Sequence, residues 1–161
     1  MTIHCILNGE EVTFNANVNE RLINILRETF PLTGAKCGCL AGNCGACSII
    51  FNHKVVKACL IAAFQVRGSK LITIEGFAHT DEYRDIVQGF ARAGVRNCGY
   101  CDAGKILTVE TLLVQNPHPS RLDILAGFNG IRCRCTEPDS LIQGVLIAAS
   151  IRQLRLYGRA I

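Results

Sequence analysis

A glycine- and cysteine-rich stretch dominates the first half of this 161-residue chain, and it reads Lys36-Cys37-Gly38-Cys39-Leu40-Ala41-Gly42-Asn43-Cys44-Gly45-Ala46-Cys47. Cys39, Cys44 and Cys47 have the spacing C-x4-C-x2-C, and Cys59 follows after eleven intervening residues. A tight loop brings three thiolates together only if its backbone passes close around the group that they hold. Glycine permits this approach and leaves backbone N–H groups free to point at sulfur. The stretch therefore predicts a metal-binding loop that Cys59 completes.

The spacing distinguishes between the metal centres that four cysteines can hold. Three clustered cysteines with a distant fourth are the arrangement of plant-type ferredoxins, which hold a [2Fe-2S] cluster. Zinc held by four cysteines is the strongest competitor, but zinc sites usually pair two similar knuckles. Burial as free thiols is a common fate of isolated cysteines, and these four are not isolated. The spacing therefore favours a [2Fe-2S] cluster on Cys39, Cys44, Cys47 and Cys59.

A second set of four cysteines lies in the other half of the chain. Cys98 and Cys101 form a C-x2-C pair, and Cys133 and Cys135 form a C-x-C pair. We expect each pair to lie at the start of a helix, where the helix dipole favours anionic ligands. Taken alone, this motif is compatible with zinc or with iron and sulfur. Because it follows a ferredoxin-like half, we predict a second [2Fe-2S] cluster, since two neighbouring one-electron centres form a path for electrons.

Composition places the chain among compact globular proteins. Hydrophobic residues make up 49% and charged residues 19%, and the 15 glycines and 4 prolines are dispersed, which excludes collagen-like and low-complexity chains. The longest apolar runs, 58–64 and 145–149, fall far short of the roughly 18 residues of a membrane span. The first residues show no basic leader, so the cytoplasm is the expected location. In that reducing compartment, ten cysteines indicate metal ligation rather than disulfides.

The formal net charge of +4 does not point to a nucleic-acid partner. Two oxidised [2Fe-2S] clusters with their eight thiolates would give each site a charge of about −2 and bring the total near zero. The basic residues are scattered, and aromatic residues make up only 6% with no tryptophan, so stacking platforms and basic stripes are not evident. We therefore discount nucleic-acid binding.

Hydrophobic patterning divides the chain into two halves. In the first, alternating runs at 3–7 and 12–16 flank Asn8-Gly9, which predicts a β-hairpin. A short helix is expected at 21–29 with Asn19 as its N-cap, and strands at 48–51, 54–56 and 71–74. The pattern then becomes helical, with candidates at 81–93, 103–115, 120–127 and 139–156. We therefore predict an α+β protein with a mixed domain at 1–77 and an all-α four-helix domain at 78–161.

Several motifs resemble the iron-sulfur small subunit of the molybdenum hydroxylases, the xanthine dehydrogenase and aldehyde oxidase family. The similarity covers nearly the whole chain and rests on the cysteine-rich stretch, Ala58-Cys59-Leu60, Thr73-Ile74-Glu75-Gly76, Cys98-Gly99-Tyr100-Cys101 and Cys133-Arg134-Cys135-Thr136. The resemblance implies a plant-type ferredoxin-like (β-grasp) domain followed by a helical domain, each with one [2Fe-2S] cluster. It also implies an electron-transfer role in an oxidoreductase whose substrate chemistry lies outside this chain.

The resemblance further implies partners. In the family, the helical-domain cluster faces a molybdopterin-binding large subunit, and the ferredoxin-like cluster passes electrons to an FAD-binding medium subunit or another acceptor. The substrate would be a purine, another N-heterocycle or an aldehyde, and this chain would contain no catalytic residue. Two other functions stay open, a free-standing two-cluster ferredoxin and a zinc-stabilised interaction module. Iron content and co-purification with larger subunits would distinguish these three functions.

Three departures from the family pattern lie beside the second set of cysteines. The usual Gln before the first of them is Asn97, the usual Thr-Pro after the second is Asp102-Ala103, and the usual Thr-Gly-Tyr after the last is Thr136-Glu137-Pro138. In the family, this Gln is positioned to hydrogen-bond the pterin, so Asn97 is the candidate cofactor-binding residue. Its side chain is one methylene shorter, so contact needs a shifted backbone or a bridging water. Alternatively, Asn97 caps the helix that follows.

Four further residues near these features have expected roles of their own. Cys5 shares a strand face with apolar neighbours, so we expect a buried packing residue. Cys37 lies beside the loop as a spare thiol or an alternative ligand. Lys105 and Arg134 lie near predicted ligands and are candidates to contact a partner's anionic cofactor.

Overall fold

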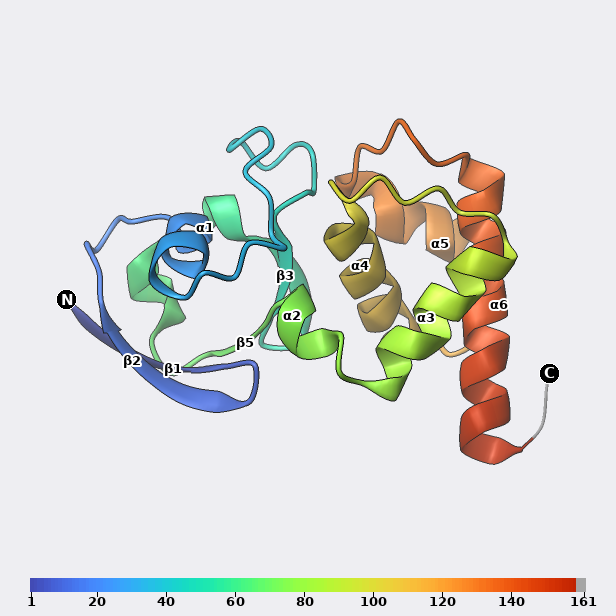
Figure 1. Ribbon diagram of the computed structural model, residues 1–161, viewed down its shortest axis with the longest axis horizontal. Helices are drawn as coiled ribbons and strands as arrows, with labels where there is room; N and C mark the ends of the chain where they lie inside the picture. The colour runs from blue at the N-terminus through green and yellow to red at the C-terminus, as the bar shows by residue number, and fades with distance from the viewer. Residues whose placement is uncertain (159–161) are drawn as a thin grey trace.

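The computed structural model describes residues 1–158 and places a mixed sheet beside a group of helices (Figure 1). The last three residues of the predicted helical domain, 159–161, lie outside the described residues. The strands are β1 (Thr2–Leu7), β2 (Glu10–Asn15), β3 (Ser48–Phe51), β4 (Lys54–Lys57) and β5 (Lys70–Ile72). Within the described residues they form one five-stranded sheet in the order β2-β1-β5-β3-β4. β1 pairs parallel with β5, and the other neighbours are antiparallel, so this half has the mixed architecture that we predicted.

The predicted hairpin between β1 and β2 is confirmed. Asn8 (φ 53°) and Gly9 (φ 91°) both adopt the left-handed conformation that a two-residue type I′ turn requires. Alternate residues of β1, namely Ile3, Cys5 and Leu7, are buried in the core beneath the sheet. Cys5 is therefore a packing residue, as expected.

A short helical segment covers one face of the sheet. α1 (Leu22–Asn24) continues directly into a π-helical turn, η1 (Ile25–Thr29), and both contribute buried apolar side chains to the sheet core. The prediction that Asn19 caps this helix is wrong, because the N-cap position is Arg21, which is extended and makes no capping hydrogen bond. Two 3-10 turns, η2 (Ala58–Leu60) and η3 (Ala63–Val66), then connect β4 to β5.

The second half is helical, as predicted. It comprises α2 (Ile74–Phe77), α3 (Asp81–Arg92), α4 (Asp102–Gln115), α5 (Arg121–Gly127), the 3-10 turn η4 (Phe128–Gly130) and α6 (Pro138–Tyr157). α3 and α6 pack along each other, and α4 contacts both α3 and β3 (Figure 1). Among residues 1–158, no helix combines the length and the apolar character that crossing a membrane requires.

β3 joins the two halves through its alternating side chains. Ile49 belongs to the core between the sheet and α1, whereas Ile50 belongs to the core among the helices, together with Phe77. Because successive side chains of a strand point to opposite faces, one strand contributes to both cores. The two halves therefore pack directly on each other, and the loop that precedes β3 lies at their junction.

The start of α3 offers a test of helix capping beside this junction. Thr80 Oγ1 accepts a hydrogen bond from the Tyr83 N–H at 3.1 Å. We expect Thr80→Ala to lower the free energy of unfolding by about 1 kcal/mol, because one N–H of the first turn loses its acceptor. Thr80→Ser keeps the hydroxyl, so it should lower the free energy of unfolding much less than Thr80→Ala does. Denaturant unfolding of the three proteins measures the difference, and equal stability of the Ala and Ser variants would contradict the capping role.

Candidate metal centres

The first predicted centre is formed by the loop that precedes β3 and by η2. Cys47 immediately precedes β3, and Cys59 lies within η2. Cys39 and Cys44 lie in the loop that projects beyond the sheet, drawn in cyan in Figure 1. The four residues form two neighbouring pairs, since the thiol of Cys44 acts on the pKa of Cys39 and that of Cys59 acts on the pKa of Cys47. The fold thus brings together all four cysteines that the spacing selected.

Backbone N–H groups surround the sulfur of Cys39. The N–H groups of Ala41, Asn43 and Cys44 donate to its Sγ at 3.4, 3.2 and 3.3 Å. The N–H of Ala41, followed by that of Cys44, lowers the pKa of Cys39 from its ordinary 9.0 to about 6. Metals bind the thiolate, so the loop prepares Cys39 as a ligand.

Cys47 has the opposite electrostatic environment. Burial raises its pKa to about 11, and its neighbour Cys59 is buried as well. A neutral thiol is a poor ligand, but a bound metal deprotonates it. Cys47 and Cys59 therefore suit a buried metal centre, whose positive charge would stabilise their thiolates.

Glycine is required where the loop closes, as its spacing predicted. A Cβ on Gly38 would lie 2.6 Å from Cys44 Sγ, and a Cβ on Gly42 would lie 2.5 Å from Leu60 Cδ1. Gly45 has a φ of +79°, and its Cβ would lie 2.6 Å from Gly130 O in the helical half. Side chains at these positions would displace a predicted ligand, Leu60 beside the ligand Cys59, or the opposing half.

The second predicted centre lies between the starts of two helices. Cys101 immediately precedes α4, and Cys133 and Cys135 lie in the loop between η4 and α6. These residues also form neighbouring pairs, since the thiol of Cys133 acts on the pKa of Cys101 and that of Cys98 acts on the pKa of Cys135. Burial is the main cause that raises the pKa of Cys101 to about 12. The C-x2-C and C-x-C motifs therefore interleave, with one cysteine of each motif in every pair.

The paired arrangement fits a [2Fe-2S] cluster better than a single metal ion. Such a cluster has two irons, each held by two cysteines, so its ligands divide into two pairs. A structural zinc ion instead needs four ligands around one point. The donor set and its division into pairs therefore fit iron and sulfur at both places.

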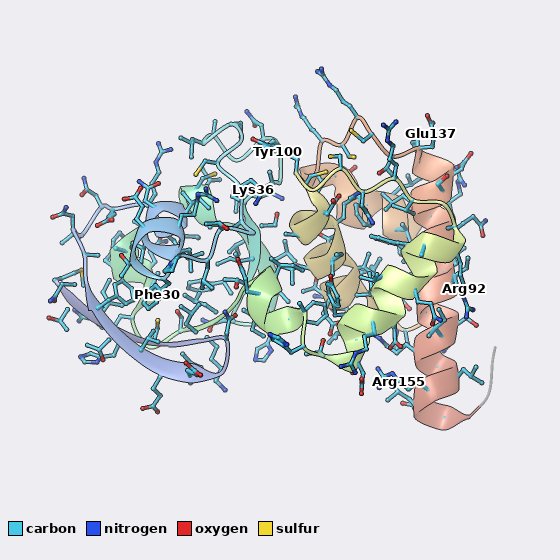
Figure 2. All side chains as sticks on the ribbon, viewed as in Figure 1. Phe30, Lys36, Arg92, Tyr100, Glu137 and Arg155 are labelled. Atoms are coloured by element: carbon cyan, nitrogen blue, oxygen red, sulfur yellow. The ribbon has the colours of Figure 1, made fainter. Side chains whose placement is uncertain are left out.

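The two predicted centres are neighbours. A cavity of about 290 Å³ is lined by the four cysteines of the second set and also by Cys44 and Tyr100. The N–H of Arg132 donates to Cys44 O at 3.0 Å, so a residue next to Cys133 is bonded to a predicted ligand of the first centre. Tyr100 Oη donates to Cys37 O at 3.4 Å, and Figure 2 shows this side chain between the cysteine-rich loop and the helical half. The two predicted sets of ligands therefore lie next to each other.

Two expectations for this region are corrected by the structure. Lys105 is fully buried, and its Nζ donates to Arg96 O at 3.2 Å and to Asn97 Oδ1 at 3.0 Å, so it cannot reach a partner's cofactor. Asn97 does not cap the next helix, because the N-cap of α4 is Cys101 and has no side-chain cap. Asn97 is instead exposed, with its amide oxygen held by Lys105. Arg134 is exposed, and its contact with a partner stays a prediction.

Sequence reasoning missed a lysine beside the first centre. Lys57 Nζ donates to Ser48 Oγ at 3.1 Å, and Ser48 Oγ donates to Gly45 O at 2.8 Å. Burial lowers the pKa of Lys57, whereas the nearby thiols, Cys47 foremost, act in the opposite direction. Its position two residues before Cys59 was the available signal. Tyr100, inside the C-x2-C motif, was missed as a contact between the two centres.

The ionisation of Cys39 can be measured in cluster-free protein. We expect its alkylation by iodoacetamide to rise with pH and to reach half of its maximal rate near pH 6, because the N–H donors stabilise the thiolate whose pKa is about 6. Peptide mass spectrometry across a pH series follows this residue alone. A half-maximal rate near the ordinary value of 9.0 would show that the N–H groups do not act on this sulfur.

Two family models match the chain. The model described as "2Fe-2S iron-sulfur cluster binding domain" matches residues 5–69, and the model described as "[2Fe-2S] binding domain" matches residues 73–146. Each predicted set of four cysteines falls within one of these matches. The two halves therefore each resemble a known iron-sulfur domain.

Whole-chain relatives carry both domains. The chain is 43% identical over 136 residues to the nicotinate dehydrogenase small FeS subunit of Eubacterium barkeri, covering 84% of this chain and 87% of that protein. It is 32% identical to the xanthine dehydrogenase iron-sulfur-binding subunit of Escherichia coli O157:H7, covering 91% of this chain and 92% of that protein. Among solved structures, a chain of quinoline 2-oxidoreductase from Pseudomonas putida 86 superposes with a TM-score of 0.86 at 32% identity, covering 95% of this chain and 96% of that chain. The chain is thus similar to these proteins both in sequence and in fold, over most of its length.

Proposed function

The chain belongs to the family of [2Fe-2S] small subunits of molybdenum hydroxylases, where it serves in electron transfer, and from this membership we propose how electrons pass through it. When bound, each [2Fe-2S] cluster accepts and releases one electron. We assign the first cluster to Cys39, Cys44, Cys47 and Cys59, and the second to Cys98, Cys101, Cys133 and Cys135. The observation that supports both assignments is the division of each set into two neighbouring pairs of thiols.

Electrons enter at the helical half in this proposal. A molybdopterin-binding large subunit docks beside the second set of cysteines, near the exposed Asn97. The Asn97 Oδ1 accepts from Lys105 at 3.0 Å, which orients the amide and leaves its Nδ2 as a donor for the pterin. A bridging water compensates for the side chain that is shorter than the family's Gln.

The electron then crosses to the ferredoxin-like half. The contact between Arg132 N–H and Cys44 O, at 3.0 Å, supports a short route between the two ligand sets. The first set lies in a loop that projects from the sheet, with exposed residues Cys39 and Leu40. We propose that an FAD-binding subunit receives the electron there. We also propose that 1–77 and 78–161 are the two domains, each with one cluster.

The reaction itself takes place on the large subunit. The nicotinate dehydrogenase, xanthine dehydrogenase and quinoline oxidoreductase names of the relatives support an N-heterocycle or purine as the substrate, with an aldehyde as the alternative. A cytoplasmic location is supported by the ten cysteines of the chain, because a reducing compartment keeps cysteines from forming disulfides and leaves them available as metal ligands. This chain contributes no residue to the substrate chemistry.

Purification of the native complex tests this proposal. We expect an affinity tag on this chain to recover two larger subunits, one containing molybdopterin and one containing FAD, and to recover hydroxylase activity with an N-heterocycle. Recovery of the chain alone, with iron and without larger subunits, would overturn the subunit role in favour of a free-standing ferredoxin.

A further inference from the structure

Lys105 is a fully buried lysine one turn into α4, four residues after Cys101. Its Nζ donates to Arg96 O at 3.2 Å, to Asn97 Oδ1 at 3.0 Å and to Thr136 Oγ1 at 3.1 Å. An ammonium group is rarely buried, because removing it from water is costly unless partners surround it. These three oxygens and a nearby carboxylate satisfy this requirement.

The partners of Lys105 come from every segment that carries the second set of cysteines. Arg96 and Asn97 directly precede Cys98, and Thr136 directly follows Cys135. Thr136 Oγ1 also donates to Arg96 O at 2.7 Å, so the two loops are joined through this group. Lys105 therefore holds the C-x2-C and C-x-C motifs in register with each other and with α4.

Asp102 carries the charge that faces Lys105. Its Oδ1 lies 3.0 Å from Lys105 Nζ, and this buried oxygen makes no hydrogen bond within the described residues. The other carboxylate oxygen accepts from the Gly99 N–H at 2.5 Å. Lys105 lines one cavity together with Cys133 and Thr136, so its ammonium group lies beside the second set of cysteines.

We propose that Lys105 is a positioning residue that sets the reduction potential of the helical-domain cluster. The proposal rests on the ligand set Cys98, Cys101, Cys133 and Cys135. Reduction adds one electron to the cluster and one negative charge beside the ammonium group, so Lys105 stabilises the reduced form and raises the potential. Asp102 offsets part of this effect. The electron comes from substrate oxidation on the large subunit.

Two isosteric substitutions separate a charge effect from a packing effect. Lys105→Met removes the positive charge and should lower the potential of the helical-domain cluster. Asp102→Asn removes the negative charge and should raise it. The double variant, which leaves no unpaired buried charge, should fall between the two. Lys54→Met, at an exposed site on β4, is the matched control.

Redox titration followed by electron paramagnetic resonance measures both clusters in one protein, so the ferredoxin-like cluster serves as an internal reference. We expect Lys105→Met to change the ratio of oxidised to reduced helical-domain cluster by about tenfold at fixed potential, which corresponds to a shift of about 59 mV for one electron. The ferredoxin-like cluster and the Lys54→Met protein should not shift.

The outcomes distinguish this proposal from the function on which it rests. A wild-type protein with a single cluster would overturn the ligand assignment, and the role of Lys105 with it. A wild-type protein with two clusters, in which Lys105→Met and Asp102→Asn shift the potential in the same direction or not at all, would overturn the role of Lys105 alone. If the Lys105→Met protein does not assemble the cluster, the reduction potentials of Asp102→Asn and of the double variant test the role of Lys105 instead. A raised potential in Asp102→Asn that the double variant reverses would support the proposal, and an unmoved potential would overturn it.

Discussion

Serine in place of Cys133 is expected to reduce the iron content from about four to about two per chain and to remove one of two electron paramagnetic resonance signals. Serine is a weak iron ligand, so the substitution leaves the second set with three thiolates. Cys44→Ser should remove the other signal and spare the first. Iron analysis and spectra of the dithionite-reduced proteins measure both effects.

Cys37→Ser is the matched control for these two substitutions. Cys37 is an exposed cysteine in the same loop and lies outside both predicted ligand sets, so its replacement should leave about four irons and both signals. Loss of both signals from Cys44→Ser or Cys133→Ser, in protein that is still folded, would show that the two sets are mispaired. Loss of a signal from Cys37→Ser would make this residue a ligand.

The second large effect is expected at the contact between the two halves. A Cβ on Gly104 would lie 2.4 Å from Gly45 O, which is backbone of the loop that carries Cys44 and Cys47. Gly104→Ala gains about 1 kcal/mol of helix propensity, but forcing two backbones apart costs about 1–3 kcal/mol and sometimes more. We expect a net loss of about 1 kcal/mol and slower electron transfer between the clusters, since the loop moves away from α4.

Gly127 provides the control for this substitution. It also lies in a helix, but a Cβ there would meet nothing closer than 3.9 Å, so Gly127→Ala should keep or slightly increase stability. Thermal unfolding compares the two variants, and rapid-mixing reduction of the assembled complex follows the two clusters. A Gly104→Ala protein as stable as the wild type, with an unchanged rate, would contradict the close packing of the two halves.

Local patterns predicted most of the fold. Alternation around Asn8-Gly9 gave the hairpin, and helical spacing gave the four long helices, because these signals depend on neighbours in sequence. The cap of the first helix was predicted wrongly because α1 begins from an extended Arg21 and widens into a π-helical turn, which a 3.6-residue period does not reveal. The cap assigned to Asn97 failed for a related reason, since tertiary contact with Lys105 holds that side chain.

The candidate site was predictable as a set of residues but not as a geometry. Spacing selected eight cysteines, yet it could not show that Cys98 pairs with Cys135 and Cys101 with Cys133, because the two motifs meet only through folding. The burial of Lys105 could not be predicted from the sequence either, because it depends on contacts that form only when the chain folds. A lysine among helix formers is normally exposed, and only the positions of Arg96 O and Thr136 explain why this one lies inside.

The metal content of the purified chain distinguishes a two-cluster iron-sulfur protein from the alternatives. We expect about four irons and about four acid-labile sulfides per chain, with two distinct rhombic electron paramagnetic resonance signals after reduction by dithionite. A content of about two irons, or zinc in place of iron, would contradict this expectation.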